Sequence, residues 1–113
     1  MSDITLGIIG GGQLGSMLAI AAKKLNIKTI IFADDSDAPA QNFCNQFISG
    51  NYEDKEKVSD FVNQVDVVTY EFENIPFETL NEINKLKPVF PKPSVNRLIQ
   101  HRLAEKDFIN KLN

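Results

Sequence analysis

Short runs of β-branched residues alternate along this chain with longer stretches in which apolar residues recur every three or four positions. The short runs predict β-strands, and the longer periodic stretches predict amphipathic helices. Strands are expected at residues 4–9, 28–33, 46–49, 65–70 and 89–90. Helices are expected at residues 13–25, about 39–45, after Asn51 as an N-cap, 77–86 and after Ser94. This order predicts a three-layer α/β domain with a mostly parallel five-stranded sheet.

The hydrophobic pattern also suggests how the strands and loops are arranged. The run at residues 65–70 (VDVVTY) is the most apolar, so it is expected to be the central strand. In parallel sheets of this kind, ligands bind at the carboxyl ends of the strands. The loops that follow the predicted strands should therefore gather at one edge and form any binding site, at residues 10–15, 34–39, 50–52 and 71–76.

The first of these loops carries a glycine motif. Residues 7–15 read GIIGGGQLG, in which Gly10, Gly12 and Gly15 satisfy the pattern G-x-G-x-x-G of Rossmann-like dinucleotide-binding domains. Such a loop lets backbone N–H groups approach a ligand closely, and the helix N-terminus favours an anion or an oxygen-rich group. The alternative is that Gly15 only permits close packing between helix and strand.

An acidic residue stands where the dinucleotide pattern requires one. Asp34 follows the second predicted strand, at about the position from which a carboxylate holds a ribose. Residues 34–37 (DDSD) are also good turn formers, so a solvated turn is the alternative interpretation.

Two further carboxylates, Glu71 and Glu73, follow the strand predicted at residues 65–70. At low effective dielectric they would repel a buried pyrophosphate by several kcal/mol, whereas ribose hydroxyls or an amino group would find good acceptors there. This stretch therefore argues against NAD. A structural ion pair between Glu71 and a lysine is the alternative for one of the two carboxylates.

Overall composition narrows the class of protein. The chain has 113 residues, enough for one domain, and its net charge of −3 gives no electrostatic footprint for nucleic acid. No apolar run is long enough to span a membrane. The single cysteine, Cys44, is expected in the core and fits a reducing cytoplasm. With one His and one Cys, a structural zinc site is almost excluded, and no metal site is assigned.

The last candidates lie near the C-terminal end of the chain. Arg102 and Lys106 are four residues apart on a predicted helix, a spacing that suits a phosphate, although the residues alone favour exposed surface charge as the explanation. His101 has no recognisable nucleophile or acid around it, so it is assigned no catalytic role.

Four motifs together, GIIGGGQLG.M, YEFENIP, P.PS and RL.EK, resemble the N-terminal domain of the N5-carboxyaminoimidazole ribonucleotide synthetase family, which are ATP-grasp enzymes of bacterial and fungal purine synthesis. The resemblance runs from Ile4 to Leu112. It implies a pre-ATP-grasp domain over residues 1–113, a Rossmann-like fold that holds no NAD. It also implies a cytoplasmic enzyme that is a homodimer at full length.

In that family this domain helps to bind aminoimidazole ribonucleotide, while a separate ATP-grasp domain binds ATP with Mg and bicarbonate. The resemblance implies ribonucleotide contacts, and a nucleotide-phosphate (ATP) contact at Arg102. The ribonucleotide contacts that it implies are Gly12, Gln13, Leu14, Asp34 and Glu73. No catalytic residue is assigned, and ATP-grasp and C-terminal domains are expected to be absent from this chain, which alone should not turn over.

Two positions depart from the family pattern. Ser16 stands where relatives usually carry Arg or Lys, and His101 stands where Asp usually precedes Arg-Leu. Two other functions compete with the carboxylating ligase. The glycine motif with Asp34 fits an NAD(P)-binding domain of an oxidoreductase, and a non-catalytic interaction module would bind neither nucleotide.

Overall fold

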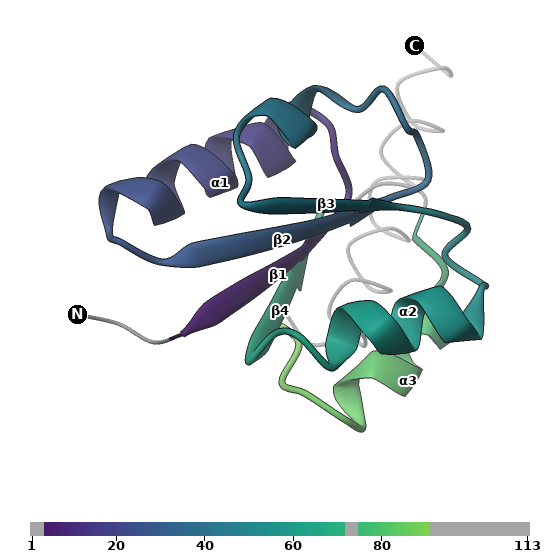
Figure 1. The fold of residues 1–113 in the computed structure, drawn as a ribbon. Helices are drawn as coiled ribbons and strands as arrows, with labels where there is room; N and C mark the ends of the chain where they lie inside the picture. Colours follow the sequence, from purple (N-terminus) through teal and green to yellow (C-terminus); the bar gives the residue numbers. More distant parts are fainter. Residues whose placement is uncertain (1–3, 72–74, 91–113) are drawn as a thin grey trace, which may run out of the picture.

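The computed structural model describes residues 4–71 and 75–90. Four strands and three α-helices alternate along this part of the chain, with one short 3-10 helix, η1 (Figure 1). The elements are β1 (Thr5–Ile9), α1 (Gln13–Lys24), β2 (Lys28–Ala33), η1 (Pro39–Asn42), β3 (Gln46–Ser49), α2 (Lys55–Val62), β4 (Val67–Tyr70) and α3 (Phe77–Asn84). The predicted order of strands and helices is confirmed from β1 to α3.

All four strands are parallel and are arranged in the order β3-β2-β1-β4. Helix α1 and η1 cover one face of the sheet, and α2 and α3 cover the other (Figure 1). The three-layer α/β architecture is therefore confirmed. The strand order reverses between β1 and β4, because the chain moves outward through β2 and β3 and returns to the other side of β1. Such a reversal is where open parallel sheets bind ligands.

The prediction of a fifth strand is wrong for the described residues. Val89 makes only an isolated parallel bridge with Val68. In this bridge the Val68 N–H donates to the Pro88 carbonyl oxygen, and the Phe90 N–H donates to the Val68 carbonyl oxygen. Proline cannot donate a ladder hydrogen bond, and Pro88 and Pro91 enclose the two residues. The pairing therefore stays at one bridge.

The expected central position of residues 65–70 is also wrong for the strands that the structure describes. Strand β4 ends the four-strand order, and β1 and β2 occupy the interior positions. The bridge with Val89 covers the outer edge of β4, which explains why an apolar strand is tolerated there. The apolar content of a strand indicates how far it is buried, but it does not determine the position of the strand in the sheet.

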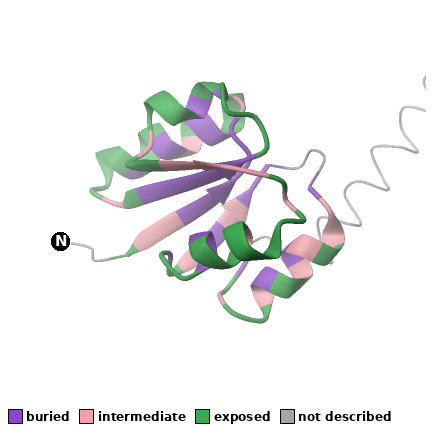
Figure 2. Cartoon of the chain, turned by 45° about the vertical axis from the view of Figure 1, so that its right-hand side comes forward, coloured by how far each residue is buried: buried purple, intermediate pink, exposed green. Residues whose placement is uncertain are grey.

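The sheet separates two hydrophobic clusters, and most buried residues lie on the strands and on the helix faces toward them (Figure 2). The larger cluster lies under α2 and α3 and includes Phe32, Phe61 and Tyr70. The smaller cluster, under α1 and η1, includes Ile8 and Ile31. Cys44 is only partly buried against this smaller cluster, in the turn after η1, so its predicted place in the core is wrong.

Two helix boundaries show how local polar groups fix the chain. Helix α1 ends before Asn26, which has a φ of 60°, so the predicted stop is confirmed. Helix α2 starts later than expected, because Asp54 and not Asn51 is the N-cap and accepts the Lys57 N–H at 3.2 Å. Asn51 instead accepts the Glu53 N–H at 2.7 Å in the preceding turn. Among the described residues, no helix has the length and apolarity needed to cross a membrane.

Candidate functional site

A cavity of about 200 Å³ opens at the carboxyl edge of the sheet, where the strand order reverses. All four loops expected at this edge contribute to it, so their predicted convergence is confirmed. Its lining comprises Gly10, Gly11, Gly12, Ala33, Asp34, Asp35, Ala38, Pro39, Tyr52, Glu71 and Ile75. We refer to this cavity as the glycine-loop pocket.

The Glu71 side chain lies inside the glycine motif. The backbone N–H of Gly15 donates to Glu71 Oε1 at 2.6 Å, and Glu71 is only 8% exposed. A Cβ atom added at Gly10 would lie 2.9 Å from Glu71 Oε2, and one added at Gly12 would lie 3.2 Å from the same oxygen. Gly10 and Gly12 therefore leave room for this carboxylate, while an added Cβ at Gly15 would first meet the Gly10 carbonyl oxygen at 2.6 Å and then Glu71 Oε1 at 3.2 Å.

Glu71 is held in place by its own backbone as well as by the loop. Its N–H donates to the carbonyl oxygen of Ile9, the last residue of β1, at 3.0 Å. The side chain then reaches across to the first turn of α1. In the described part of the chain its hydrogen-bond partner is thus a backbone N–H, and the alternative of an ion pair with lysine is not what the structure has.

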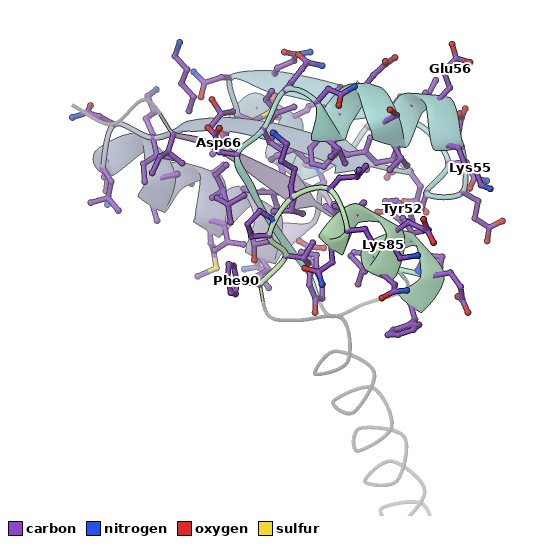
Figure 3. All side chains as sticks on the ribbon, turned by 90° about the horizontal axis from the view of Figure 1, so that it is seen from below. Tyr52, Lys55, Glu56, Asp66, Lys85 and Phe90 are labelled. Atoms are coloured by element: carbon purple, nitrogen blue, oxygen red, sulfur yellow. The ribbon has the colours of Figure 1, made fainter. Side chains whose placement is uncertain are left out.

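Asp34 and Tyr52 form a second polar pair in the pocket. The Tyr52 hydroxyl lies near Asp34, whose carboxylate acts on it electrostatically, and the Tyr52 ring packs against Phe32 with ring centroids 5.9 Å apart. Thr79 at the start of α3 donates to the Tyr52 carbonyl oxygen at 3.0 Å, and Figure 3 shows Tyr52 beside this helix. Asp34 is exposed, as a solvated turn would be, yet it also lines the pocket.

Burial raises the pKa of Tyr52 to about 12, and the negative charges of Asp34 and Glu71 add to the shift. Both influences disfavour a phenolate. Tyr52 is therefore a neutral donor at physiological pH.

Charge determines what the pocket accepts. Three carboxylates line it, from Asp34, Asp35 and Glu71, and no Lys, Arg or His is among the described lining residues. A phosphate would be repelled there, whereas hydroxyl and amino groups would find acceptors. The lining of the pocket consequently favours the donor-rich part of a ligand over a phosphate group.

The structure separates the predicted site residues into three groups. Gly12 and Asp34 line the pocket. Gln13 and Leu14 form the first turn of α1 and are exposed beside the pocket without lining it. Glu73 and Arg102 lie outside the described residues, as do His101, Lys106 and the helix expected after Ser94.

Sequence reasoning missed Tyr52, and it treated Glu71 as a possible acceptor at this edge without placing it among the ribonucleotide contacts. The loop at residues 50–52 was expected at this edge, which is the signal that could have identified Tyr52. Ser16, where the family pattern has a basic residue, is 8% exposed, and its hydroxyl donates to the Gly12 carbonyl oxygen at 3.1 Å. Its side chain therefore supports the loop. Residues 4–71 and 75–90 contain no group of three or more His, Cys, Asp or Glu placed to hold a metal ion.

Titration of the two tyrosines tests the environment of Tyr52. Burial also raises the pKa of Tyr70 to about 12, so we expect tyrosinate absorbance to appear only toward pH 12 in the folded chain and near pH 10 in denaturant. The folded state favours both neutral phenols. The free energy of unfolding should then be unaffected below about pH 10 and should fall as the pH approaches 12. In Tyr52→Phe only Tyr70 should remain, and it should still ionise toward pH 12. A tyrosine that ionises near pH 10 in the folded chain would contradict the burial described for its side chain.

The parallel sheet, the glycine-rich turn into α1 and the polar pocket at the strand ends define an α/β domain of the nucleotide-binding type. A family model described as the ribonucleotide synthetase preATP-grasp domain matches residues 3–100. The chain belongs to this family, which confirms the resemblance found in its sequence.

Named relatives agree with this assignment. The bifunctional purine synthesis protein purC/E of Dictyostelium discoideum is 45% identical over 109 residues, which are 96% of this chain and 11% of that protein. The N5-carboxyaminoimidazole ribonucleotide synthase of Staphylococcus epidermidis is 41% identical over 96% of this chain and 29% of its own length. The chain therefore spans less than a third of either relative.

Solved structures match the fold closely. An ADP complex of N5-carboxyaminoimidazole ribonucleotide synthetase superposes with a TM-score of 0.85 at 34% identity, over 98% of this chain and 29% of that one. The Aspergillus clavatus enzyme in complex with ADP and 5-aminoimidazole ribonucleotide gives a TM-score of 0.77 at 29% identity, over 97% and 30% of the two chains.

Proposed function

We propose that this chain is the pre-ATP-grasp domain of an ATP-dependent ligase that carboxylates 5-aminoimidazole ribonucleotide with bicarbonate in purine biosynthesis, and that it helps to bind the ribonucleotide. One observation carries the proposal: the glycine-loop pocket is lined by carboxylates and by a neutral phenol, and by no cation among its described residues. Such a lining favours ribose hydroxyls and an amino group over phosphates. The family assignment and the ribonucleotide complex of a relative support the same choice.

Within this proposal each candidate residue has a defined part. Asp34 accepts from a hydroxyl or amino group of the ribonucleotide, Gly12 presents backbone to it, and Gln13 and Leu14 contact it from the exposed first turn of α1. Glu73 provides a second acceptor from the acidic motif, and Arg102 contacts the ATP phosphates.

We assign ATP and Mg to a separate ATP-grasp domain, as the resemblance to the family implies, and the acidic lining of the glycine-loop pocket agrees with this assignment. Bound there, ATP would supply the phosphoryl group that activates bicarbonate for attack by the ribonucleotide amine. The described residues would contribute only binding and orientation of that amine. A cytoplasmic homodimer completes the proposal.

Steady-state kinetics of the full-length enzyme test the ribonucleotide site. We expect Asp34→Ala and Glu73→Ala each to raise the KM for aminoimidazole ribonucleotide about tenfold or more, since each removes an acceptor to a buried donor, and to leave the KM for ATP unchanged. Glu56→Ala provides a matched control, because this glutamate is exposed on α2 and does not line the pocket. Unchanged KM values for the ribonucleotide in both variants would remove these residues from the site.

Saturable binding of NADH to the unmodified chain would instead favour the oxidoreductase alternative. Its motivation is the glycine motif with Asp34, and a fluorescence titration measures it directly.

A further inference from the structure

The position of Glu71 raises the question of what the glycine motif binds. A glycine-rich turn at a helix N-terminus is an anion site, because backbone N–H groups point outward, the helix dipole favours negative charge and no Cβ blocks approach. In this chain the anion that meets the turn is a carboxylate of the chain itself. The carboxylate that follows β4 accepts the Gly15 N–H in the first turn of α1, 56 residues away along the sequence.

All three motif glycines surround the same carboxylate. Measured from the position of an added Cβ, Gly10 and Gly12 approach Glu71 Oε2 to 2.9 and 3.2 Å, and Gly15 approaches Oε1 to 3.2 Å. The fit of a carboxylate belonging to the chain itself thus accounts for Gly10 and Gly12, and Gly15 is required both by this carboxylate and by the backbone of Gly10.

Other backbone donors of the loop are also engaged internally. The Gly10 N–H donates to the Phe32 carbonyl oxygen at 2.8 Å, and the Ser16 N–H donates to the Gly12 carbonyl oxygen at 3.0 Å. A pyrophosphate placed on this turn would have to compete with Glu71 for the Gly15 N–H and would lie against a buried negative charge. Like charges in contact repel strongly where water is excluded.

We propose that Glu71 is a specificity-determining residue: its carboxylate occupies the anion-binding turn of the glycine motif and thereby excludes the pyrophosphate of a dinucleotide. Ligands that donate hydrogen bonds remain admissible, because the rest of the pocket presents acceptors. This role concerns only residues of the described chain and does not depend on which ribonucleotide the proposed ligase uses.

Calorimetric titration of the 113-residue chain with inorganic pyrophosphate and with NADH tests the role of Glu71. The unmodified chain should bind pyrophosphate at least about tenfold more weakly than Glu71→Ala, in which the turn is vacant and uncharged. Glu71→Gln retains an acceptor for the Gly15 N–H and fills the same space, so its gain in affinity should be smaller than that of Glu71→Ala. Asp35→Ala is the matched control, because it removes another carboxylate from the same pocket. Asp35 Oδ1 accepts the Asp37 N–H and makes no described hydrogen bond with the glycine motif.

Amide hydrogen exchange provides a second readout that does not depend on added ligand. The Gly15 amide should be protected in the unmodified chain, should exchange faster in Glu71→Ala, and should regain protection when pyrophosphate is added to that variant. Equal pyrophosphate affinity in the unmodified chain and in folded Glu71→Ala would overturn the proposal, as would an equal gain in Asp35→Ala. If Glu71→Ala does not fold, the comparison of Glu71→Gln with Asp35→Asn decides. Glu71→Gln should gain more affinity for pyrophosphate than Asp35→Asn, and an equal or smaller gain in Glu71→Gln would overturn the proposal.

Discussion

Gly15→Ala is expected to lower the free energy of unfolding by about 2–4 kcal/mol, a large share of the roughly 5–15 kcal/mol typical of a domain. The added methyl group would lie 2.6 Å from the Gly10 carbonyl oxygen and 3.2 Å from Glu71 Oε1. The first contact is with backbone, so relief requires α1 to move away from the end of β1. Alanine gains about 1 kcal/mol of helix propensity over glycine, which offsets only part of this cost.

Gly50→Ala is a matched control for this substitution. Its added methyl group would also lie 2.6 Å from the nearest atom, but that atom is Lys57 Cδ on a flexible, exposed side chain. Lys57 can move aside with the loss of one exposed hydrogen bond to the Ser49 carbonyl oxygen, so we expect a cost below about 1 kcal/mol. Urea unfolding of both variants measures the difference. Equal losses would show that α1 adjusts freely at Gly15, contrary to the close packing described for the loop.

The course of the chain was predictable where local sequence determines it. The strand at residues 28–33 has the bounds that its apolar pattern predicted, and the stop of α1 at Asn26 follows from one residue that tolerates a positive φ. The start of α2 was misplaced because Asn51 and Asp54 are both good capping residues. Which of them caps depends on where the chain leaves β3, and sequence pattern does not contain that information.

The candidate site was predictable in its location but not in its internal contacts. Alternation of strands and helices was sufficient to gather four loops at one edge. The partner of the glycine motif could not be predicted, because the contact between Gly15 and Glu71 joins residues from different βα units. Tyr52 was missed for a related reason, since its role depends on the Asp34 side chain across the pocket. Long-range contacts of this kind exist only once the sheet order is known.

Phe61→Ala is expected to have the largest effect on stability, about 3–5 kcal/mol. The Phe61 ring is 1% exposed, packs against Phe32 with centroids 5.6 Å apart, and lies over Gly7 in β1. A Cβ atom added at Gly7 would lie 2.7 Å from Phe61 Cζ, so glycine is what allows the ring to approach the strand. Loss of the ring opens a cavity beneath α2 whose walls are strands of the sheet, and these cannot collapse without disturbing the edge that carries the pocket.

A double-mutant cycle isolates this contact. Gly7→Ala alone should destabilise the chain by about 1–3 kcal/mol through overpacking. In the Phe61→Ala background the new methyl group enters the vacated space, so the double variant should be more stable than the sum of the single changes by about 1–2 kcal/mol. Some cost should remain, because the Val65 methyl groups lie 3.0 and 3.1 Å from the same position.

The matched cycle pairs Gly7→Ala with Ile31→Ala, whose side chain lies in the hydrophobic cluster on the opposite face of the sheet. These two changes share no described contact through the Gly7 Cβ position, so their costs should add. Urea unfolding of all the variants, with the slope of each transition checked for constancy, gives both coupling energies. If the free-energy losses of Gly7→Ala and Phe61→Ala simply add, the Phe61 ring does not require a glycine at position 7. The close approach of α2 to β1 would then need another cause.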